Sequence, residues 1–341
     1  MFEKVNKIIS PEEAKAIVPM TEELAAIKKK RDAELRAIID GSDKRKVIII
    51  GPCSADNEDA VVDYVTRLAG LAEEVKDKFL LMPRIYTEKP RTKGEGYKGM
   101  FHSPNPHTGN TDIQNGICNL RHMHIRAIRE SGLTAADEML YPDNLDYVSD
   151  FLSYIAIGAR STENQQHRLV ASGIDVPVGV KNPMNGSFSV TLNSIYAAQI
   201  PNEFKYGGWQ VKTTGNKYAH AVLRGVVDVY GNNIPNYHYE DVIRFYEMYL
   251  KQHLENPAII IDTNHSNSGK NALEQIRIAK EVFGNMRYEN FNTVVKGLLV
   301  ESYIEDGNQK PDGCTYGMSV TDPCLGWEKS ARLIRELAEM V

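Results

Sequence analysis

Eight short apolar runs recur along the chain after residue 45, and segments with helical spacing lie between them. The runs are continuously apolar rather than alternating, as is typical of parallel strands that are buried on both faces. We predict strands at Val47–Ile50, Phe79–Tyr86, Leu133–Glu138, Tyr154–Ala159, Val176–Lys181, Ala219–Arg224, Ala258–Asp262 and Val294–Glu301. Helical spacing is clear around Ile113–Ala127 and Val242–His253. Thr162 and Gln165 predict the capped start of a further helix.

The order of these elements predicts the fold class. Eight strand–helix repeats within about 295 residues favour a closed (β/α)8 TIM barrel formed by residues 46–341. An open, doubly wound sheet is the alternative. It is weakened because Gly51–Ala55 reads GPCSA, where a dinucleotide-binding G-x-G-x-x-G motif would open the first helix.

Two segments fall outside the barrel rhythm. Residues 1–45 form an N-terminal extension with a charged helical stretch at Pro11–Asp40, which ends at Gly41; we predict that it packs on a neighbouring subunit. Residues 204–216 contain Gly207-Gly208 between short apolar segments, which predicts a small inserted β-hairpin before the sixth strand.

Composition limits the classes of partner. The chain has 341 residues, a net charge of -5 and a pI near 6.0, so it has no overall basic field for nucleic acid. It shows no signal-peptide pattern and no apolar run long enough for a membrane, which predicts a cytoplasmic protein. Four scattered cysteines, without a CxxC pair, suit a reducing compartment.

Cationic side chains stand at or just beyond the ends of several predicted strands. In a (β/α)8 barrel the carboxyl ends of all strands share one face, where active sites are built. Pro90 stiffens the backbone between two of these cations. The alternative is that about half of them only balance acids such as Glu88 and Glu138. The converging cations are Arg84, Lys89, Arg91, Arg160, Lys181 and Arg224.

A second set of strand-end side chains has the character of metal ligands. The set comprises Cys53, His265, Glu301 and Asp322, which follow the first, seventh and eighth predicted strands. Barrel closure makes these strands neighbours, and the mixed donors suit Mn, Fe, Co or Zn.

Each of these four residues also has a structural alternative. Cys53 could simply pack in the core, and Glu301 could balance a cation. His265 could bond Asn264 or Asn267, and Asp322 could cap a helix that begins at Pro323.

Several motifs, taken in order, resemble those of the 3-deoxy-D-arabino-heptulosonate 7-phosphate (DAHP) synthases, type I alpha class. The resemblance covers about residues 45–341 and rests on IGPCS, EKPRT, IGARSTE, PVGVKN, NHSNS and SVTDPCLGWE, which begin at residues 50, 88, 157, 177, 264 and 319. It implies a metal-dependent condensation of phosphoenolpyruvate with D-erythrose 4-phosphate, the first step of the shikimate pathway to aromatic amino acids.

The resemblance also implies residue roles. Cys53, His265, Glu301 and Asp322 match the family's ligands for one divalent metal ion, with Mn2+ expected ahead of Fe2+, Co2+ or Zn2+. We assign catalytic roles to Lys89, the candidate acid, and to His265 and Cys53. The predicted substrate-binding residues are Arg84, Lys89, Pro90, Arg91, Thr92, Glu138, Ala159, Arg160, Lys181 and Arg224.

Regulation and assembly are less constrained by the sequence. Feedback-inhibited family members bind an aromatic amino acid between the hairpin, the third βα loop and the N-terminal arm. Here the hairpin is short and the loop Tyr141–Asp146 differs, so we predict weak or altered feedback. A homodimer or homotetramer is expected.

Three other functions are alternatives. One is an octulosonate 8-phosphate synthase, disfavoured because Pro90-Arg91-Thr92 replaces its usual Ala-Asn-Arg-Ser segment after the lysine. Another is a Schiff-base aldolase that uses Lys181 as the nucleophile. The last is a catalytically inactive sugar-phosphate sensor.

Overall fold

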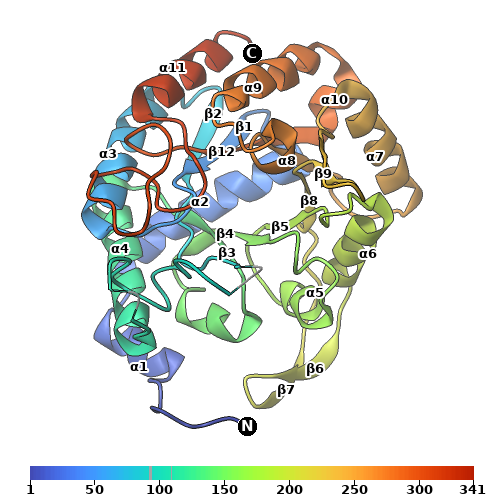
Figure 1. The fold of residues 1–341 in the computed structure, drawn as a ribbon. Helices are drawn as coiled ribbons and strands as arrows, with labels where there is room; N and C mark the ends of the chain where they lie inside the picture. Colours follow the sequence, from blue (N-terminus) through green and yellow to red (C-terminus); the bar gives the residue numbers. More distant parts are fainter. Residues whose placement is uncertain (92–93, 109) are drawn as a thin grey trace.

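Eight parallel strands form the centre of the molecule (Figure 1). The computed structural model describes residues 1–91, 94–108 and 110–341. The strands pair in the order β2-β1-β12-β11-β8-β5-β4-β3. An isolated parallel bridge between Arg84 and Ala136 links the two end strands of that series. The predicted TIM barrel is therefore confirmed. Its strands are β1 (Lys46–Gly51), β2 (Phe79–Pro83), β3 (Ala135–Glu138), β4 (Leu152–Ile157), β5 (Val178–Lys181), β8 (His220–Leu223), β11 (Ile259–Asp262) and β12 (Val295–Glu301).

Helices surround the barrel and bury one apolar face each against it (Figure 1). In α3, for example, Val61, Tyr64, Val65 and Leu68 are fully buried. The outer helices are α3 (Glu58–Glu74), α4 (Ile113–Ser131), α5 (Gln165–Ala171), α6 (Phe188–Gln199), α7 (Tyr239–Lys251), α9 (Glu274–Gly284), α10 (Glu289–Val294) and α11 (Trp327–Ala338).

One predicted helix cap is wrong, and so is the structural alternative in which Asp322 caps a helix. Helix α5 begins at Gln165 behind Asn164, whose side chain accepts a hydrogen bond from the His167 amide. Thr162 does not cap it, because its hydroxyl donates to the Lys181 carbonyl oxygen at 2.6 Å. No helix begins at Pro323 either: the next helix is α11, which Gly326 precedes.

The N-terminal extension is two helices rather than one. Helix α1 (Pro11–Ile17) starts at a capping box between Ser10 and Glu13, and α2 (Glu22–Asp40) ends at Gly41 in the left-handed conformation, as predicted. The segment between them contains Pro19, which has no amide hydrogen to continue a helix.

Helix α2 closes the amino-terminal end of the barrel. Its buried Leu35, Ile38 and Ile39 belong to the same apolar cluster as Val47 and Ile49, which are barrel-strand residues. With this end filled, the carboxyl ends of the strands are the end that is left to bind ligands.

The predicted insertion is a β-hairpin. Strands β6 (Glu203–Tyr206) and β7 (Trp209–Lys212) pair antiparallel, and Gly207 and Gly208 both adopt positive φ in the turn. The second strand ends at Lys212, within the predicted insertion of residues 204–216. Smaller elements are η1 (Pro142–Tyr147), α8 (His265–Ser268), η2 (Asn285–Arg287) and the strands β9 (Val226–Val227) and β10 (Asn233–Ile234). Among the described residues, the helices are too short or too polar to span a membrane.

Candidate active site

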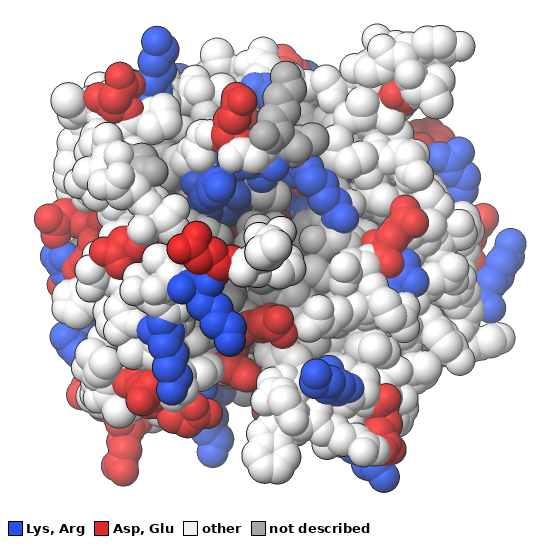
Figure 2. Space-filling model, turned by 60° about the horizontal axis from the view of Figure 1, so that its bottom comes forward, with Lys and Arg blue, Asp and Glu red and all other residues white. Residues whose placement is uncertain are grey.

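A cavity of about 200 Å³ opens at the carboxyl ends of the barrel strands. Figure 2 shows lysine and arginine side chains gathered at a hollow in one face of the molecule. Thr92 lies outside the described residues. All the other predicted substrate-binding residues line the cavity: Arg84, Lys89, Pro90, Arg91, Glu138, Ala159, Arg160, Lys181 and Arg224.

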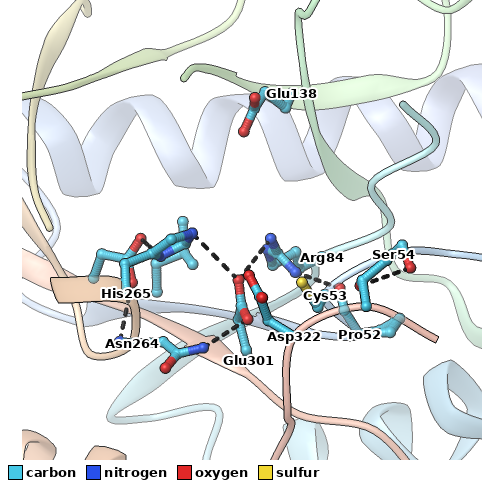
Figure 3. Close-up of polar contacts among 12 residues, drawn as sticks. Pro52, Cys53, Ser54, Arg84, Glu138, Asn264, His265, Glu301 and Asp322 are labelled. Carbon is cyan, nitrogen blue, oxygen red and sulfur yellow. Dashed lines mark hydrogen bonds and ion pairs between the residues drawn. The ribbon is translucent and has the colours of Figure 1, made fainter. Parts of the chain in front are cut away.

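Three of the four predicted metal ligands converge beside this cavity. One ligand atom from each of Cys53, Glu301 and Asp322 lies within 4.8 Å of the other two. Figure 3 shows their side chains pointing toward one another, with Glu138 well apart. His265 is not in this compact group, but its Nε2 lies 3.7 Å from Glu301 Oε1. A thiol and two carboxylates this close are a donor set that a divalent metal ion fits.

His265 is held by a strained backbone and a buried acid. It begins α8 with a φ of +52°, a conformation that is uncommon for residues other than glycine. Its Nδ1 lies 2.9 Å from Asp262 Oδ2, so neither Asn264 nor Asn267 is its main partner. Burial lowers the pKa of His265, which favours the neutral ring that binds metals.

Glu301 is fully buried yet charged. Arg84 NH2 lies 3.0 Å from its Oε1, and Asn264 donates to its Oε2 at 2.6 Å. Burial would raise the pKa of this carboxyl, but Arg84 and His265 hold the pKa below its usual value. Within the described part of the chain, Oε1 receives no hydrogen bond. A buried carboxylate oxygen that receives no hydrogen bond and lies near Cys53 and Asp322 is well placed to bind a metal cation.

Lys89 contacts this cluster directly. Its Nζ lies 2.7 Å from Cys53 Sγ and donates to the Cys53 carbonyl oxygen at 2.9 Å. Burial would lower the pKa of Lys89, but Cys53 and Glu301 raise it. Burial would raise the pKa of Asp322, but Lys89 and Lys270 lower it to about 2. The cluster therefore keeps Lys89 protonated and Asp322 ionised at neutral pH.

The rest of the cavity is strongly cationic. Seven lysines and arginines line it against two carboxylates, those of Glu138 and Asp322. Lys181 is 2% exposed, and its Nζ lies 3.4 Å from Asp262 Oδ2 and 4.0 Å from Glu138 Oε2. Some of the cations are thus paired, as the structural alternative supposed, but the excess of positive charge suits a ligand with more than one anionic group.

Gly158 leaves the space that Glu138 needs. A Cβ at position 158 would come 2.4 Å from Glu138 Oε1, which is far below van der Waals contact. Gly51 plays the same part at the end of β1, where a Cβ would lie 2.2 Å from the Arg84 carbonyl oxygen. Both glycines let neighbouring strands bring functional side chains together.

Comparison with known proteins agrees with the site. The family model described as "DAHP synthetase I family" matches residues 17–335. The chain belongs to this family. The type I DAHP synthase resemblance in its sequence is therefore confirmed.

Curated relatives share the family over nearly their whole length. This family member is 37% identical to the phospho-2-dehydro-3-deoxyheptonate aldolase of Haemophilus influenzae over 348 aligned positions. The alignment covers 100% of this chain and 93% of the relative. The chain is 34% identical to the Tyr-sensitive enzyme of Escherichia coli K12, with coverage of 97% and 92%. It is 33% identical to the Trp-sensitive enzyme of that strain, with coverage of 99% and 96%.

A solved structure has the same fold. The phospho-2-dehydro-3-deoxyheptonate aldolase of Francisella tularensis SCHU S4 aligns with a TM-score of 0.93 at 29% identity. The alignment covers 100% of this chain and 98% of that one. Membership of this metal-dependent family makes the protein an enzyme. Its cluster of Cys53, Glu301 and Asp322 is a candidate for the metal centre.

Three further residues of this family member help to shape the site and were not predicted from its sequence. Asp262 orients His265, Asn264 holds Glu301, and Lys270 pairs with Asp322 at 3.0 Å. Asp262 could have been found, since it is a carboxylate at a strand's end like Glu301. Lys270 carried no such signal because it follows a single helical turn, α8, and has a positive φ.

Proposed function

We propose that the protein condenses phosphoenolpyruvate with D-erythrose 4-phosphate and water to give DAHP and phosphate, the first step of the shikimate pathway. Family membership supports the reaction class. The observation that carries the proposal is the position of Lys89, which lies between the Cys53/Glu301/Asp322 cluster and the cationic cavity.

We infer that one divalent metal ion, Mn2+ ahead of Fe2+, Co2+ or Zn2+, is held by Cys53, His265, Glu301 and Asp322. The metal would act as a Lewis acid that polarises the aldehyde oxygen of erythrose 4-phosphate. The Oε1 of Glu301, which receives no hydrogen bond from the described residues, and the neutral ring of His265 support this ligand set. Asp262, whose Oδ2 lies 2.9 Å from His265 Nδ1, would leave Nε2 as the coordinating atom.

Phosphoenolpyruvate would lie in the cationic part of the cavity. Arg160, Lys181 and Arg224 line the cavity where they can hold its phosphate and carboxylate. Arg84 adds a positive charge to the same lining and forms an ion pair with Glu301. Because Lys181 is buried and close to two acids, it is better suited to binding an anion than to serving as a neutral nucleophile. Ala159 and Glu138 complete the wall.

The chemistry then needs an acid at the aldehyde and a fixed approach of the two carbons. Carbon 3 of the enol phosphate attacks the aldehyde carbon as Lys89 donates a proton to the aldehyde oxygen. Water adds at carbon 2, and phosphate leaves from that carbon. The raised pKa of Lys89 keeps its proton available at neutral pH. The arginines hold the first substrate so that attack and hydration occur with correct geometry.

Erythrose 4-phosphate would contact the segment formed by Lys89, Pro90, Arg91 and Thr92. Arg91 donates from Nε to the Tyr97 carbonyl oxygen at 2.8 Å, which anchors its guanidinium group at the wall of the cavity. We predict a clear preference for erythrose 4-phosphate over arabinose 5-phosphate. Equal kcat/KM values for the two sugars would contradict the assignment.

An aromatic amino acid is the proposed effector. A second cavity, of about 510 Å³, lies between the hairpin residues Phe204, Tyr206 and Val211, the loop after β3, and Lys28 of α2. Its charged lining residues are Lys28, Asp146, Asp150, Asp175 and Lys212. The Trp-sensitive and Tyr-sensitive names of relatives support an effector of this class.

The decisive assay measures consumption of phosphoenolpyruvate in the presence of erythrose 4-phosphate. We expect activity with added Mn2+ and none in its absence after EDTA treatment. Activity that ignores chelation would rule out the metal-dependent mechanism. Phosphoenolpyruvate binding without any turnover would instead favour a sugar-phosphate sensor.

A further inference from the structure

Glu88 is a buried acid immediately before the proposed acid Lys89. Its side chain is 5% exposed, and Asn144 Nδ2 donates to its Oε1 at 2.8 Å. Burial raises the pKa of Glu88 to about 8, although the hydrogen bond from Asn144 acts in the opposite direction. The negative charges of Asp137 and Glu138 on β3 add to that rise. Burial therefore favours the neutral form of the Glu88 carboxyl group at pH 7.

The backbone around Glu88 is held tightly on both sides. Thr87 donates its amide hydrogen to Asp137 Oδ1 at 3.0 Å and its hydroxyl hydrogen to Oδ2 of the same carboxylate. Gly99, with a φ of +98°, approaches so closely that a Cβ there would lie 2.7 Å from the Glu88 Cα. The Lys89 amide donates to the Lys98 carbonyl oxygen at 3.0 Å. The direction in which Lys89 leaves this segment is thus set by its neighbours.

The turn that holds Glu88 is itself fixed to the fold. In η1, the Pro142 carbonyl oxygen accepts a hydrogen bond from Tyr206 at 2.9 Å, and the Tyr147 carbonyl oxygen accepts one from Arg121 at 2.6 Å. The Glu88 side chain is the link from the Lys89 segment to this anchored turn. It reaches η1 through Asn144, whose Nδ2 donates to Glu88 Oε1.

We propose that Glu88 is a positioning residue, which ties the Lys89 segment to Asn144 and so places the Lys89 ammonium group against Cys53. The proposal rests on the proposed function, in which Lys89 is the acid. It requires the neutral form of Glu88, because an ionised carboxylate would put a third negative charge beside two others. The charged or titratable groups around it are Asp137 and Glu138 on β3, His124 of α4 behind Asp137, and Lys89 and Lys98 on its own segment.

Two substitutions separate the reach of the side chain from its acidity. Glu88→Gln keeps the acceptor for Asn144 and cannot ionise, so we expect kcat within about threefold of wild type at pH 7. Glu88→Asp keeps the acid but shortens the side chain by one methylene, so we expect kcat to fall about tenfold or more. Asn144→Ala should show a similar loss, and Glu88→Ala/Asn144→Ala no further loss than either single variant.

The dependence of kcat on pH distinguishes this role from a purely structural one, which would leave that dependence unchanged. In wild type, kcat should fall as pH rises through about 8, where Glu88 loses its proton. In Glu88→Gln that fall should be absent or shifted to higher pH. Glu305→Gln, at an exposed acid, is the matched control and should follow wild type throughout. The proposal is overturned if Glu88→Asp and Asn144→Ala keep wild-type kcat, or if Glu88→Gln retains the wild-type profile.

Hydrogen exchange tests the positioning without any turnover. Amides in a peptide ending at Arg91 should exchange faster in Glu88→Ala and Asn144→Ala than in wild type, but not in Glu88→Gln. Unchanged exchange in both truncations would overturn the proposal. If wild type itself does not consume the two substrates, the proposed function fails, while this exchange experiment still decides the link between Glu88 and the segment. Should Glu88→Ala fail to fold, Asn144→Ala and Glu88→Gln carry the test.

Discussion

The ammonium group of Lys89 lies 2.7 Å from the sulfur of Cys53 and also donates to the Cys53 carbonyl oxygen. One residue thus bonds to both the side chain and the backbone of a predicted metal ligand. The contact fixes the distance between the proposed proton donor and the proposed metal centre. It also favours a thiolate at Cys53, although burial raises the pKa of that thiol.

Lys89→Met should abolish turnover and leave the metal centre assembled. Methionine keeps much of the side-chain volume but cannot donate a proton, so we expect kcat to fall by about 10²- to 10⁴-fold. Kinetics and a Mn2+ titration would check the two parts separately. Lys98→Met, at an exposed lysine nearby, should keep kcat close to wild type. A near-normal kcat in Lys89→Met would remove this residue from the acid role.

Cys53→Ser should weaken metal binding. A serine hydroxyl is a poorer ligand than a thiolate for Mn, Fe, Co or Zn, so a higher Mn2+ concentration should be needed for half-maximal activity. Competition with a chelating dye would measure the affinity directly. Cys314→Ser changes an exposed thiol that does not belong to the cluster and serves as control. Equal metal affinity in both variants would exclude Cys53 as a ligand.

Arg121→Ala should destabilise the protein strongly. The Arg121 guanidinium is fully buried and bonds Asp150, the Tyr147 carbonyl oxygen and the Val18 carbonyl oxygen, so it joins the N-terminal extension to the barrel. Removing it leaves Asp150 without its partner, at a cost of about 3–5 kcal/mol in the free energy of unfolding. Urea unfolding would measure this. Arg126→Ala, on the outer face of the same helix, should cost about 1 kcal/mol or less.

Lys46→Met should change how stability depends on pH. Burial and the nearby lysines 296 and 44 lower the pKa of Lys46 from 10.5 to about 7. Between these pH values the unfolded chain binds more protons than the folded protein, so Lys46 makes the free energy of unfolding rise with pH, by up to about 1.4 kcal/mol per unit. The variant should lose that rise between pH 7 and 9. Lys30→Met, which removes the same charge at an exposed lysine that does not contribute to this shift, should keep it.

Inhibition by aromatic amino acids should be weak or altered. The effector cavity is lined by three carboxylates and two lysines, which attract an amino acid's ammonium group more than its carboxylate. Inhibition by phenylalanine, tyrosine and tryptophan at fixed substrate would test this. Val211→Trp places a larger side chain in the cavity and should remove any inhibition without lowering kcat. Gln210→Ala, at the neighbouring hairpin residue, should leave any inhibition unchanged. Clear inhibition by low micromolar phenylalanine would contradict the prediction.

The barrel could be predicted because its strands carry a strong local signal. Runs such as Val47–Ile50 and Ala258–Asp262 are apolar throughout, and parallel strands covered by helices leave few other folds for that pattern. The same logic placed the cations and metal donors on one face. Boundaries were harder: Asn164, not Thr162, caps α5, because the hydroxyl of Thr162 donates to the carbonyl oxygen of Lys181, a residue 19 positions away.

The contacts between side chains within the site could not be predicted from the sequence. Nothing in the order of residues indicates that Lys89 meets Cys53, or that Asp262 takes His265 away from its neighbouring asparagines. These contacts depend on the positive φ of His265 and on loop paths that strand patterns do not determine. The N-terminal extension showed the same limit, since its predicted single helix gave no hint that α2 fills one end of the barrel.

The pairing of β1 with β12 has a consequence for how the chain is made. Val47 is in register with Gly297, so the first barrel strand obtains one of its two neighbours only after synthesis has reached β12. Until then β1 presents an open edge during synthesis, which invites pairing with other chains. Such long sequence separation also slows folding. We therefore expect nascent or C-terminally shortened chains to depend on chaperones and to aggregate, however stable the finished enzyme is.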